Sequence, residues 1–444
     1  LEFRRVLFRS AIDEVADDAS RGGVKTGDIL DVLKKVYSSS VFYTVVNSIE
    51  ALVPFLLTPI LTRFLLPYSF GLWTLFVSFV SFFRPIVSLS FYDAIRMRFF
   101  DMDKKQRSHF TASALFLSLG VTLFFVLLTL VFRSTFGMLM KFPPDWIVSI
   151  IVTAFFFGLF YFLLAFNQFS GDRLNFTLLH IVQTSVSFLC ITALILLGME
   201  WRGAIIGKNL GLLCCVIVGV HYFTPQLEKQ FIQKPKIQDM KELTSFGIYY
   251  LPTGLGLVLA GLSDRLILAH MGSVEQSGYY GVAELFGSVL VLIERGFILA
   301  WMPWLFHHHL KAHDEKAMKE VYAVSLLFLT LLPFVGLTVY GASLIIAPII
   351  VGEKFKLALD FIPWAIAAMA FRGLFAHNQA FLLYKKKVLA MSVSSIVFTL
   401  LNVVVTYALV TDYGIKGVYG ATCISYLAAA LLNVVFILWA YRRK

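Results

Sequence analysis

The chain has 444 residues, of which 59% are hydrophobic and 15% are charged, and its formal net charge is +11. A soluble domain has about 25% charged residues, so this composition argues against a soluble enzyme. A nucleic-acid-binding protein gathers basic residues on one face of one folded domain, whereas here they are spread over the loops between apolar runs. The charge therefore indicates membrane orientation and attraction to anionic lipid headgroups, and we expect no nucleic-acid partner.

The first ten residues do not fit the rest of the chain. Leu1–Ser10 reads LEFRRVLFRS and back-translates in one frame to a widely used sequencing-adapter oligonucleotide, which indicates an assembly artefact. Residues 11–41 are polar, and Gly27–Ser40 has the pattern of a short amphipathic helix. We expect 11–41 to form a cytoplasmic segment whose amphipathic part lies along the inner membrane surface.

Twelve apolar runs of about 20 residues follow, and a helix of that length spans the roughly 30 Å hydrocarbon layer of a bilayer. The runs are Phe42–Leu61, Phe70–Phe91, Phe110–Phe132, Ile147–Phe166, Phe176–Gly198, Gly203–Phe223, Phe246–Ala269, Ser277–Met302, Val321–Gly341, Leu357–Leu383, Val388–Val410 and Gly417–Tyr441. This pattern predicts an all-α polytopic membrane protein with about 12 transmembrane helices.

The distribution of Lys and Arg predicts the orientation of the chain. If the N-terminus lies inside, the inner segments carry 23 Lys and Arg residues and the outer loops carry 7. Lys and Arg concentrate in cytoplasmic loops. The asymmetry predicts that both termini lie inside and that the number of spans is even.

Two halves of the chain share short features, which indicates an internal duplication. In each half, one predicted span ends at an Arg, and helix-weakening Pro or Gly residues lie nine and four positions before that Arg. The matching sets are Pro54, Pro59 and Arg63, and Gly256, Gly261 and Arg265. A glycine followed by aromatic residues comes next in both halves, at Gly71 and at Gly278.

The duplication predicts two six-helix bundles, 42–223 and 246–444, joined by a cytoplasmic linker at 224–245. Six is an even number, so both bundles have the same orientation and are related by an axis along the membrane normal. Weakened helices at matching places in two halves favour a substrate path between them.

Ionisable residues inside the predicted spans are the main functional signal. Each costs about 2.5–3.5 kcal/mol or more at the bilayer centre unless it is paired or wetted, so their number indicates a water-filled cavity. They are Glu50, Arg84, Lys208, Asp264, Arg265, Glu284, Glu294, Arg295 and Arg372. The basic members suit an anionic group such as phosphate. The alternative for each Arg is a structural tie to a carbonyl or to an acid.

Glu50 lies midway along the first span, beside Asn47 and before Pro54. It is a candidate for carrying a coupling proton or helping to bind Na⁺, and the alternative is that it neutralises an Arg. Asp264 and Glu294 are further coupling or ion-pairing candidates.

Other chemistry has little support in the sequence. There is no G-x-x-x-x-G-K-[ST] loop for ATP hydrolysis, no Gly-x-Ser-x-Gly and no long outer loop with paired acids. His307, His308 and His309 are consecutive and would point in different directions on a helix, so one metal ion would not easily use all three. The four cysteines lie in apolar runs without metal spacing and are expected to be buried hydrophobes. We therefore expect no enzyme, no metal and no cofactor beyond a coupling ion, H⁺ or Na⁺.

Several motifs, in order, resemble the polysaccharide and O-antigen flippases of the multidrug/oligosaccharidyl-lipid/polysaccharide exporter superfamily. The similarity covers about residues 30–441. The motifs are Pro54-x4-Pro59-Ile60-Leu61-Thr62-Arg63, Tyr250-Leu251-Pro252 leading to Ser263-Asp264-Arg265, Gly278-Tyr279-Tyr280, Ala300-Trp301-Met302-Pro303-Trp304, and Tyr413-Gly414-Ile415-Lys416-Gly417.

The resemblance implies a flippase that moves a polyprenyl-diphosphate-linked oligosaccharide from the inner to the outer leaflet by alternating access. Arg265 and Arg84 would hold the diphosphate or acidic sugars, with Arg372 and Arg295 as further candidates. It also implies a multi-pass protein of a bacterial or archaeal cytoplasmic (inner) membrane, with membrane lipids, a polysaccharide polymerase and other export proteins as possible partners. The glycan would be an O-antigen, capsule or exopolysaccharide repeat unit.

Two alternatives stay open. A multidrug or cation antiporter of the same superfamily would want a net acidic cavity for cationic drugs, whereas the charge inside the spans here leans basic. A membrane polysaccharide polymerase or ligase would need a sizeable outer catalytic loop, and no outer loop exceeds about 20 residues.

Overall fold

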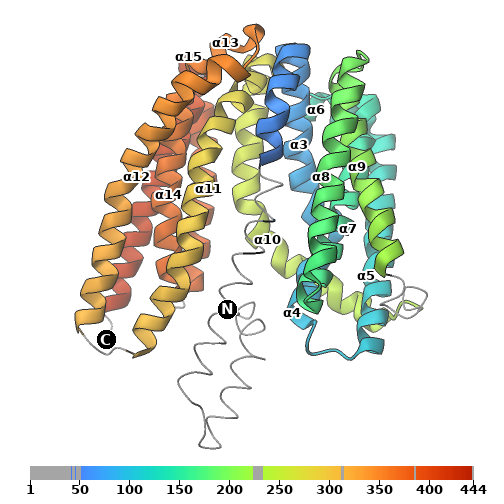
Figure 1. The fold of residues 1–444 in the computed structure, drawn as a ribbon, viewed down its shortest axis with the longest axis horizontal. Coiled ribbons are helices and arrows are strands. Elements are labelled where there is room, and N and C mark those ends of the chain that lie inside the picture. The colour runs from blue at the N-terminus through green and yellow to red at the C-terminus, as the bar shows by residue number, and fades with distance from the viewer. Residues whose placement is uncertain are drawn as a thin grey trace, which may run out of the picture. The chain divides into compact units, whose positions relative to one another are not determined.

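The computed structural model describes residues 42, 46, 52–223, 234–311, 315–384 and 387–442. The described chain is built from helices (Figure 1). A short apolar helix at Leu52–Phe64 comes first. The remaining elements are α3 (Pro67–Ser88), α4 (Phe91–Arg98), α5 (Lys104–Val131), α6 (Arg133–Met140), η1 (Pro144–Trp146), α7 (Ile147–Ser170), α8 (Arg173–Leu196), α9 (Glu200–Phe223), α10 (Ile237–Ile267), η3 (Leu268–Gly272), α11 (Val274–Lys311), α12 (Glu315–Ile350), η4 (Glu353–Phe355), α13 (Lys356–Leu359), α14 (Ile362–Tyr384) and α15 (Val388–Arg442).

Most described residues of the predicted apolar runs lie on helices, although turns at 89–90 and 360–361 interrupt two of the runs. Seven described helices are long and apolar enough to cross a membrane, or eight if the pair Glu353–Leu359 and Ile362–Leu383, bent by 49°, forms one span. Neither α10 nor α11 is among them, and both carry charged residues within their apolar stretches. The prediction of an all-helical, multi-pass membrane protein is confirmed at this level. The count of twelve, the two six-helix bundles and the inside position of both termini stay predictions.

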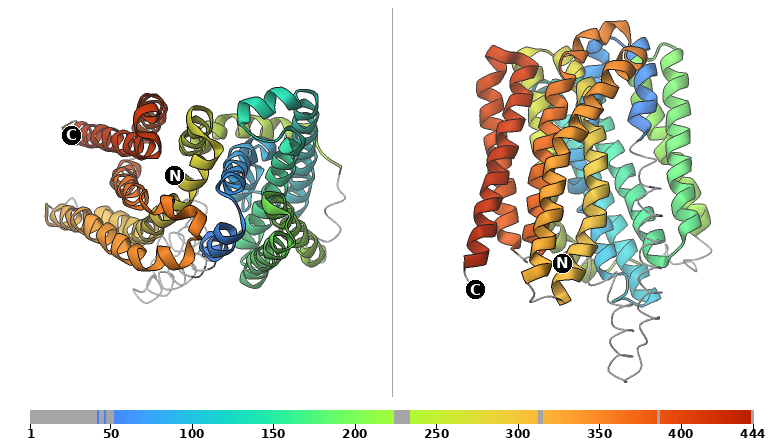
Figure 2. Two further views of the ribbon diagram at one scale, coloured as in Figure 1. Left: turned by 90° about the horizontal axis from the view of Figure 1, so that it is seen from above. Right: turned by 60° about the vertical axis from the view of Figure 1, so that its left-hand side comes forward.

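Local sequence signals determine several helix ends. α5 begins with a capping box, in which the Gln106 backbone N–H donates to Asp103 Oδ1 at 2.7 Å and the Asp103 N–H donates to Gln106 Oε1 at 3.0 Å. α7 ends at Gly171, whose φ of 79° places it in the left-handed region. Inside α15 the chain bends at Gly414, where φ is 54° and ψ is −131°. The bend separates the two spans that the sequence predicts in this region. Figure 2 shows the two arms of α15, before and after the bend, in red.

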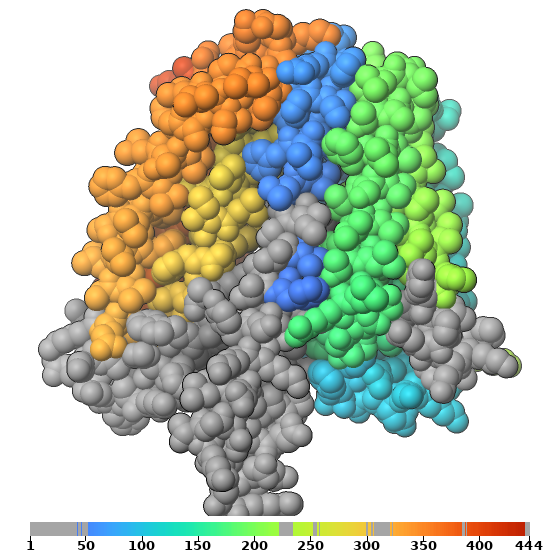
Figure 3. Space-filling model, viewed as in Figure 1, coloured from blue at the N-terminus to red at the C-terminus, as the bar shows by residue number. Residues whose placement is uncertain are grey.

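Outward faces of several helices are apolar, as expected for contact with lipid. Only 22% of the most apolar stretch of α5 and 17% of that of α12 is buried. Exposed side chains on α12 include Leu326, Phe334 and Leu337, and Figure 3 shows this helix, in orange, at the molecular surface. Apolar surface of this extent is unfavourable in water and favourable in a bilayer.

The chain divides into two compact units. Unit 1 contains, among the described residues, those up to Leu57 together with 80–136 and 143–252, and unit 2 contains 58–79, 137–142 and 253–442. This division differs from the predicted boundary at 224–245 because 58–79 group with the C-terminal helices. Residues 1–41, including the suspected artefact and the amphipathic segment, lie outside the described residues, as do 224–233 of the linker.

A reciprocal contact explains why the start of α3 belongs to unit 2. A Cβ atom on Gly71 would lie 2.0 Å from the Val274 carbonyl oxygen, and a Cβ on Gly278 would lie 2.5 Å from the Pro67 carbonyl oxygen. Gly71 thus contacts the carbonyl four residues before Gly278, and Gly278 contacts the carbonyl four residues before Gly71. These are the two glycines that the predicted repeat matches, and their contacts between α3 and α11 are reciprocal. Such an approach of two backbones requires glycine at both positions.

The cores are aromatic in both units. In unit 1, α4, α7 and α8 bury Phe91, Phe160, Phe162 and Phe176. In unit 2, Phe398 stacks on Tyr426 with ring centroids 4.1 Å apart. α8 and α9 of unit 1 lie side by side as a hairpin (Figure 1). These cores hold the helices that carry the ionisable residues.

Candidate functional site

Asp264 is a buried ionisable group of unit 2 with several hydrogen-bond partners. It lies near the end of α10, is 3% exposed and accepts three hydrogen bonds. Thr406 Oγ1 donates to its Oδ1 at 3.1 Å, and the Tyr280 hydroxyl and Thr422 Oγ1 donate to its Oδ2, each at 3.3 Å. An ionised carboxylate is an acceptor only, so three hydroxyl donors suit its charged form. The three hydroxyl groups offset part of the cost of burying this carboxyl group in an apolar helix bundle.

Asp264 is buried between three helices. Tyr280 comes from α11, while Thr406 and Thr422 come from the two arms of α15. A second layer supports them, because the Asn402 side-chain amide lies 3.3 Å from Thr422 Oγ1 and the Tyr419 hydroxyl donates to the Tyr280 carbonyl oxygen at 2.9 Å. In the sequence, charge inside an apolar run points to Asp264 but not to its hydroxyl partners. Short polar residues in the last two spans, of which Asn402 and Thr406 are four residues apart, are the signal that would have found this group.

Arg265 follows Asp264 but reaches a different partner. Its guanidinium forms an ion pair with Glu284 of α11 and donates to the Gly261 carbonyl oxygen at 3.1 Å. The guanidinium also lies 5.5 Å from the centre of the Tyr280 ring. The Arg265 side chain is 16% exposed and that of Glu284 is 27% exposed, so the pair is not sealed in a dry core.

Arg372 and Glu294 were predicted for different roles, and the structure brings them together. Arg372 Nη1 lies 2.7 Å from Glu294 Oε2, linking α14 to α11. Glu294 is 2% exposed at its side chain, so the pair stabilises a carboxylate that would otherwise be costly to bury. Arg295 is the next residue along α11, and its side chain is exposed. The sequence shows no acid near Arg372 because its partner lies 78 positions away.

Arg84 is the predicted substrate-binding residue of unit 1. It is half-buried near the end of α3. Its guanidinium lies 4.7 Å from the centre of the Tyr161 ring on α7 and hydrogen-bonds to the Tyr92 hydroxyl. A guanidinium that lies on an aromatic face keeps its positive charge, which attracts an anion.

A second arginine lies close to this group. Arg96 Nη1 lies 3.1 Å from Asp93 Oδ1, and the Arg96 guanidinium lies 6.0 Å from the Tyr92 ring. Burial raises the pKa of the Asp93 carboxyl, and Arg96 and Arg84 lower it in part. Burial likewise raises the pKa of Tyr92, and Arg84 opposes that shift. We call the residues Arg84, Tyr92, Asp93, Arg96 and Tyr161 the arginine–tyrosine cluster.

A tight turn positions the cluster. Leu89 and Ser90, between α3 and α4, have φ angles of 46° and 49°. Two consecutive non-glycine residues in the left-handed region are uncommon. The Ser90 N–H donates to the Pro85 carbonyl oxygen at 3.1 Å, and this bond closes the turn. α4 therefore starts directly beside Arg84, and it carries Tyr92, Asp93 and Arg96.

The remaining predicted sites are not brought into these groups. Glu50 lies outside the described residues. Within the part of the chain that the structure describes, no set of three or more His, Cys, Asp or Glu side chains could hold a metal ion. For His307, His308 and His309 the structure describes only the backbone, which lies in α11.

Comparison with protein families gives one match that covers most of the chain. A sequence profile described as "Polysaccharide biosynthesis protein" matches residues 36–309. No curated protein matches the chain.

Solved structures share the fold over nearly the whole chain. An inward-facing multidrug resistance MATE family transporter of the MOP superfamily has a TM-score of 0.70 and 15% sequence identity, covering 88% of this chain and 94% of that chain. The lipid II flippase MurJ, in an inward closed conformation, has a TM-score of 0.69 and 14% identity, covering 90% of this chain and 87% of that chain. An outward-facing MATE transporter of the same superfamily has a TM-score of 0.57. At these identities the likeness establishes the fold.

Proposed function

We propose, from the premise that the chain belongs to the polysaccharide biosynthesis protein family, that it is a flippase for a polyprenyl-diphosphate-linked oligosaccharide. The glycan would be a repeat unit of O-antigen, capsule or exopolysaccharide, moved from the inner to the outer leaflet of a bacterial or archaeal inner membrane. The lipid II flippase with a similar fold supports a lipid-linked sugar as the class of substrate. A polysaccharide polymerase and other export proteins are the partners expected to act on the product.

The observation that carries this proposal is the arginine–tyrosine cluster. A flippase must take a diphosphate out of water, and fixed guanidinium groups offset the lost hydration. Arg84 holds a positive charge at a half-buried position, where its guanidinium lies over the Tyr161 ring and hydrogen-bonds to the Tyr92 hydroxyl. Arg265, Arg295 and Arg372 of unit 2 are further candidates for the diphosphate or for acidic sugars.

Unit 2 supplies the candidate for coupling transport to an ion gradient. Asp264 combines deep burial with three hydroxyl oxygens within 3.3 Å. Carboxylate and hydroxyl oxygens suit a proton or a hard cation such as Na⁺. We propose Asp264 as the coupling acid, with Glu50 and Glu294 as the other candidates.

A multidrug antiporter is the second candidate function, because MATE transporters share the fold. The presence of Asp264 and Glu294 inside unit 2 is compatible with a cationic drug. The ion pairs Arg265–Glu284 and Arg372–Glu294 disfavour binding of a cationic drug. Such a drug would need the negative charges of these glutamates, and the arginines already compensate them.

Reconstituted vesicles test the proposal. Purified protein is placed in vesicles that contain a polyprenyl-diphosphate oligosaccharide, and an impermeant lectin or glycosidase measures the fraction exposed outside over time. We expect wild-type protein to accelerate exchange and Arg84→Ala to slow it at least tenfold, with Arg84→Lys intermediate because Lys lacks the planar donor set. Equal exchange rates for Arg84→Ala and wild type would contradict a role of the arginine–tyrosine cluster in holding the diphosphate. Efflux of a cationic dye without any glycan exchange would favour the antiporter.

A further inference from the structure

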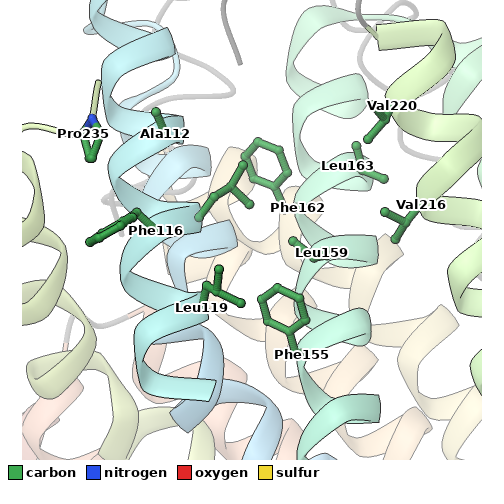
Figure 4. Close-up of a pocket in the computed structure, with 11 residues that line it drawn as sticks. Ala112, Phe116, Leu119, Phe155, Leu159, Phe162, Leu163, Val216, Val220 and Pro235 are labelled. Carbon is green, nitrogen blue, oxygen red and sulfur yellow. The ribbon is translucent and has the colours of Figure 1, made fainter. Parts of the chain in front are cut away.

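Unit 1 contains an apolar crevice between α5, α7 and α9 that the proposed transport does not use (Figure 4). Its volume is about 420 Å³, within the range of roughly 300–1,000 Å³ that is usual for ligand sites. Leu119 of α5 and Phe155 of α7 face each other across it, and Phe162, Leu163, Val216 and Val220 complete most of its wall. Pro235 lines one end.

The chemistry of the wall selects a hydrocarbon. Every lining side chain is apolar, so none of them offers a hydrogen bond to water, to a sugar or to a phosphate. Phe116 is 58% exposed and Leu119 is 46% exposed, which means that the crevice opens on a surface that faces lipid in a membrane protein. A lipid chain can enter from the side without crossing water.

The end of the crevice at Pro235 is basic and fixed in place. Lys234 and Lys236 flank this proline, and both are exposed. The Lys236 backbone N–H donates to Ser113 Oγ of α5 at 2.8 Å, and His109 Nδ1 lies 3.2 Å from the Lys234 carbonyl oxygen. These bonds attach the segment to α5, so the two lysines stay at the mouth of the crevice.

α5 shows the same change from basic to apolar along one stripe. Lys105, His109, Ala112, Phe116 and Leu119 follow the three- and four-residue spacing of one helix face. Two acids lie nearby, since Asp103 caps α5 and Asp239 lies 3.5 Å from Ser113 Oγ, and the exposed Lys105, Lys234 and Lys236 outnumber them. The surface thus matches an amphiphile with an anionic head and an apolar tail.

Dimensions distinguish between a phospholipid and a polyprenyl carrier. From His109 to Leu119 the helix rises about 15 Å, at 1.5 Å per residue, which is half of the roughly 30 Å hydrocarbon layer. This length fits one acyl chain within one leaflet. A polyprenyl chain of many isoprene units is longer than one leaflet.

We propose that this crevice binds an acyl chain of an anionic phospholipid, whose phosphate contacts Lys234 and Lys236. The bound lipid fills the space between α5 and α9 and ties the 234–236 segment to the membrane. The site is independent of the flippase proposal, because it uses no residue of the arginine–tyrosine cluster and no residue of unit 2.

The test uses the full chain in phosphatidylcholine vesicles with a trace of phosphatidylglycerol that carries a photoreactive group in its acyl chain. Adducts are mapped by peptide mass spectrometry, and unlabelled phosphatidylglycerol is added as competitor. We expect adducts on α5, α7 and α9 at the crevice. Lys234→Glu/Lys236→Glu should raise the half-maximal competitor fraction at least about thirty-fold, since each basic residue near a lipid surface contributes a factor of about five and each Glu adds repulsion.

Two further variants complete the design. Val216→Trp should fill the crevice and remove its adducts while both lysines remain. Lys354→Glu/Lys416→Glu, which reverses two exposed lysines of unit 2, should leave the adducts unchanged. The proposal is overturned if adducts are equal in all variants, if phosphatidylcholine competes as well as phosphatidylglycerol, or if only a polyprenyl phosphate displaces the probe. Monodisperse elution and unchanged helicity of each variant exclude misfolding as the cause.

Discussion

At the residue scale, charges that the sequence shows as isolated are paired across helices. Arg372 pairs with Glu294 and Arg265 pairs with Glu284, which reduces the cost of each charge inside an apolar bundle. Pairing does not by itself decide between a structural and a functional role. A double-mutant comparison separates the two roles. Removing both partners restores stability, but it does not restore a contact with the substrate.

The Arg265–Glu284 pair provides that comparison. Arg265→Ala leaves Glu284 without its partner, and we expect a loss of about 1–3 kcal/mol in stability together with loss of flipping. Arg265→Ala/Glu284→Ala should recover most of the thermal stability in detergent, because no uncompensated charge remains. If Arg265 contacts the substrate, flipping stays low in the double variant. Recovery of flipping as well as stability would assign Arg265 a purely structural role.

Asp264 is tested by removing its charge at nearly constant volume. Asp264→Asn replaces one acceptor oxygen by a donor that faces the hydroxyls of Thr406, Thr422 and Tyr280. We expect flipping to lose its dependence on a proton or sodium gradient while substrate binding is retained. The measurement is the flipping rate with and without each gradient. Asp360→Asn, at an exposed acid, is the control, and an unchanged gradient response in Asp264→Asn would contradict the assignment.

At the element scale, apolar length predicts where helices form, and packing decides how they meet. The contact of α3 with α11 depends on two glycines that the repeat matches in sequence. Periodicity shows that each glycine lies on a helix, but it does not show that they face each other. Only the reciprocal contacts, of Gly71 with the Val274 carbonyl and of Gly278 with the Pro67 carbonyl, show that they do.

Gly71→Ala tests this contact. The new Cβ would lie 2.0 Å from the Val274 carbonyl oxygen, so the helices must separate, and we expect a loss of about 1–3 kcal/mol. The measurement is the thermal unfolding midpoint in detergent. Gly341→Ala is the matched control in the same unit, because nothing lies within 4 Å of its added Cβ, and it should be neutral or stabilising by up to about 1 kcal/mol. Equal midpoints for both variants would contradict the close approach.

At the scale of the whole molecule, the described apolar helices and the membrane transporters of similar fold agree on a multi-pass membrane protein. The orientation rests on the Lys and Arg distribution. Positive loops stay on the cytoplasmic side because their transfer across the membrane is unfavourable. Lys105 belongs to a predicted inner loop, and Lys354 and Lys416 belong to predicted outer loops.

Single cysteines test the orientation. In a variant without the four native cysteines, Lys354→Cys and Lys416→Cys should react with an impermeant maleimide on intact cells, and Lys105→Cys should react only after permeabilisation. The three lysines are exposed, so accessibility reports the side of the membrane. Labelling of Lys105→Cys on intact cells would reverse the orientation.

Much of the candidate site was predictable, and its gaps have physical causes. Arg84, Asp264, Arg265, Glu294 and Arg372 stand out in the sequence because a charge in an apolar run is costly. Thr406 and Thr422 do not stand out, because hydroxyl groups in membrane helices usually bond to their own backbone. The sequence does not indicate Tyr92 and Arg96 either, because they follow the predicted span. They become neighbours of Arg84 only through the turn at Leu89 and Ser90.

The sequence by itself determined the helical class, the membrane environment and the positions of most helices, because hydrophobic length is a local property that needs no partner. It also indicated the internal repeat and the family. Only the tertiary structure decided which charges pair, that 58–79 group with the C-terminal helices, and that Asp264 lies among three hydroxyl groups. These features join residues as many as 290 positions apart, as in the bond from the Gly352 N–H to Thr62 Oγ1. Helix periodicity carries no information about contacts at that separation.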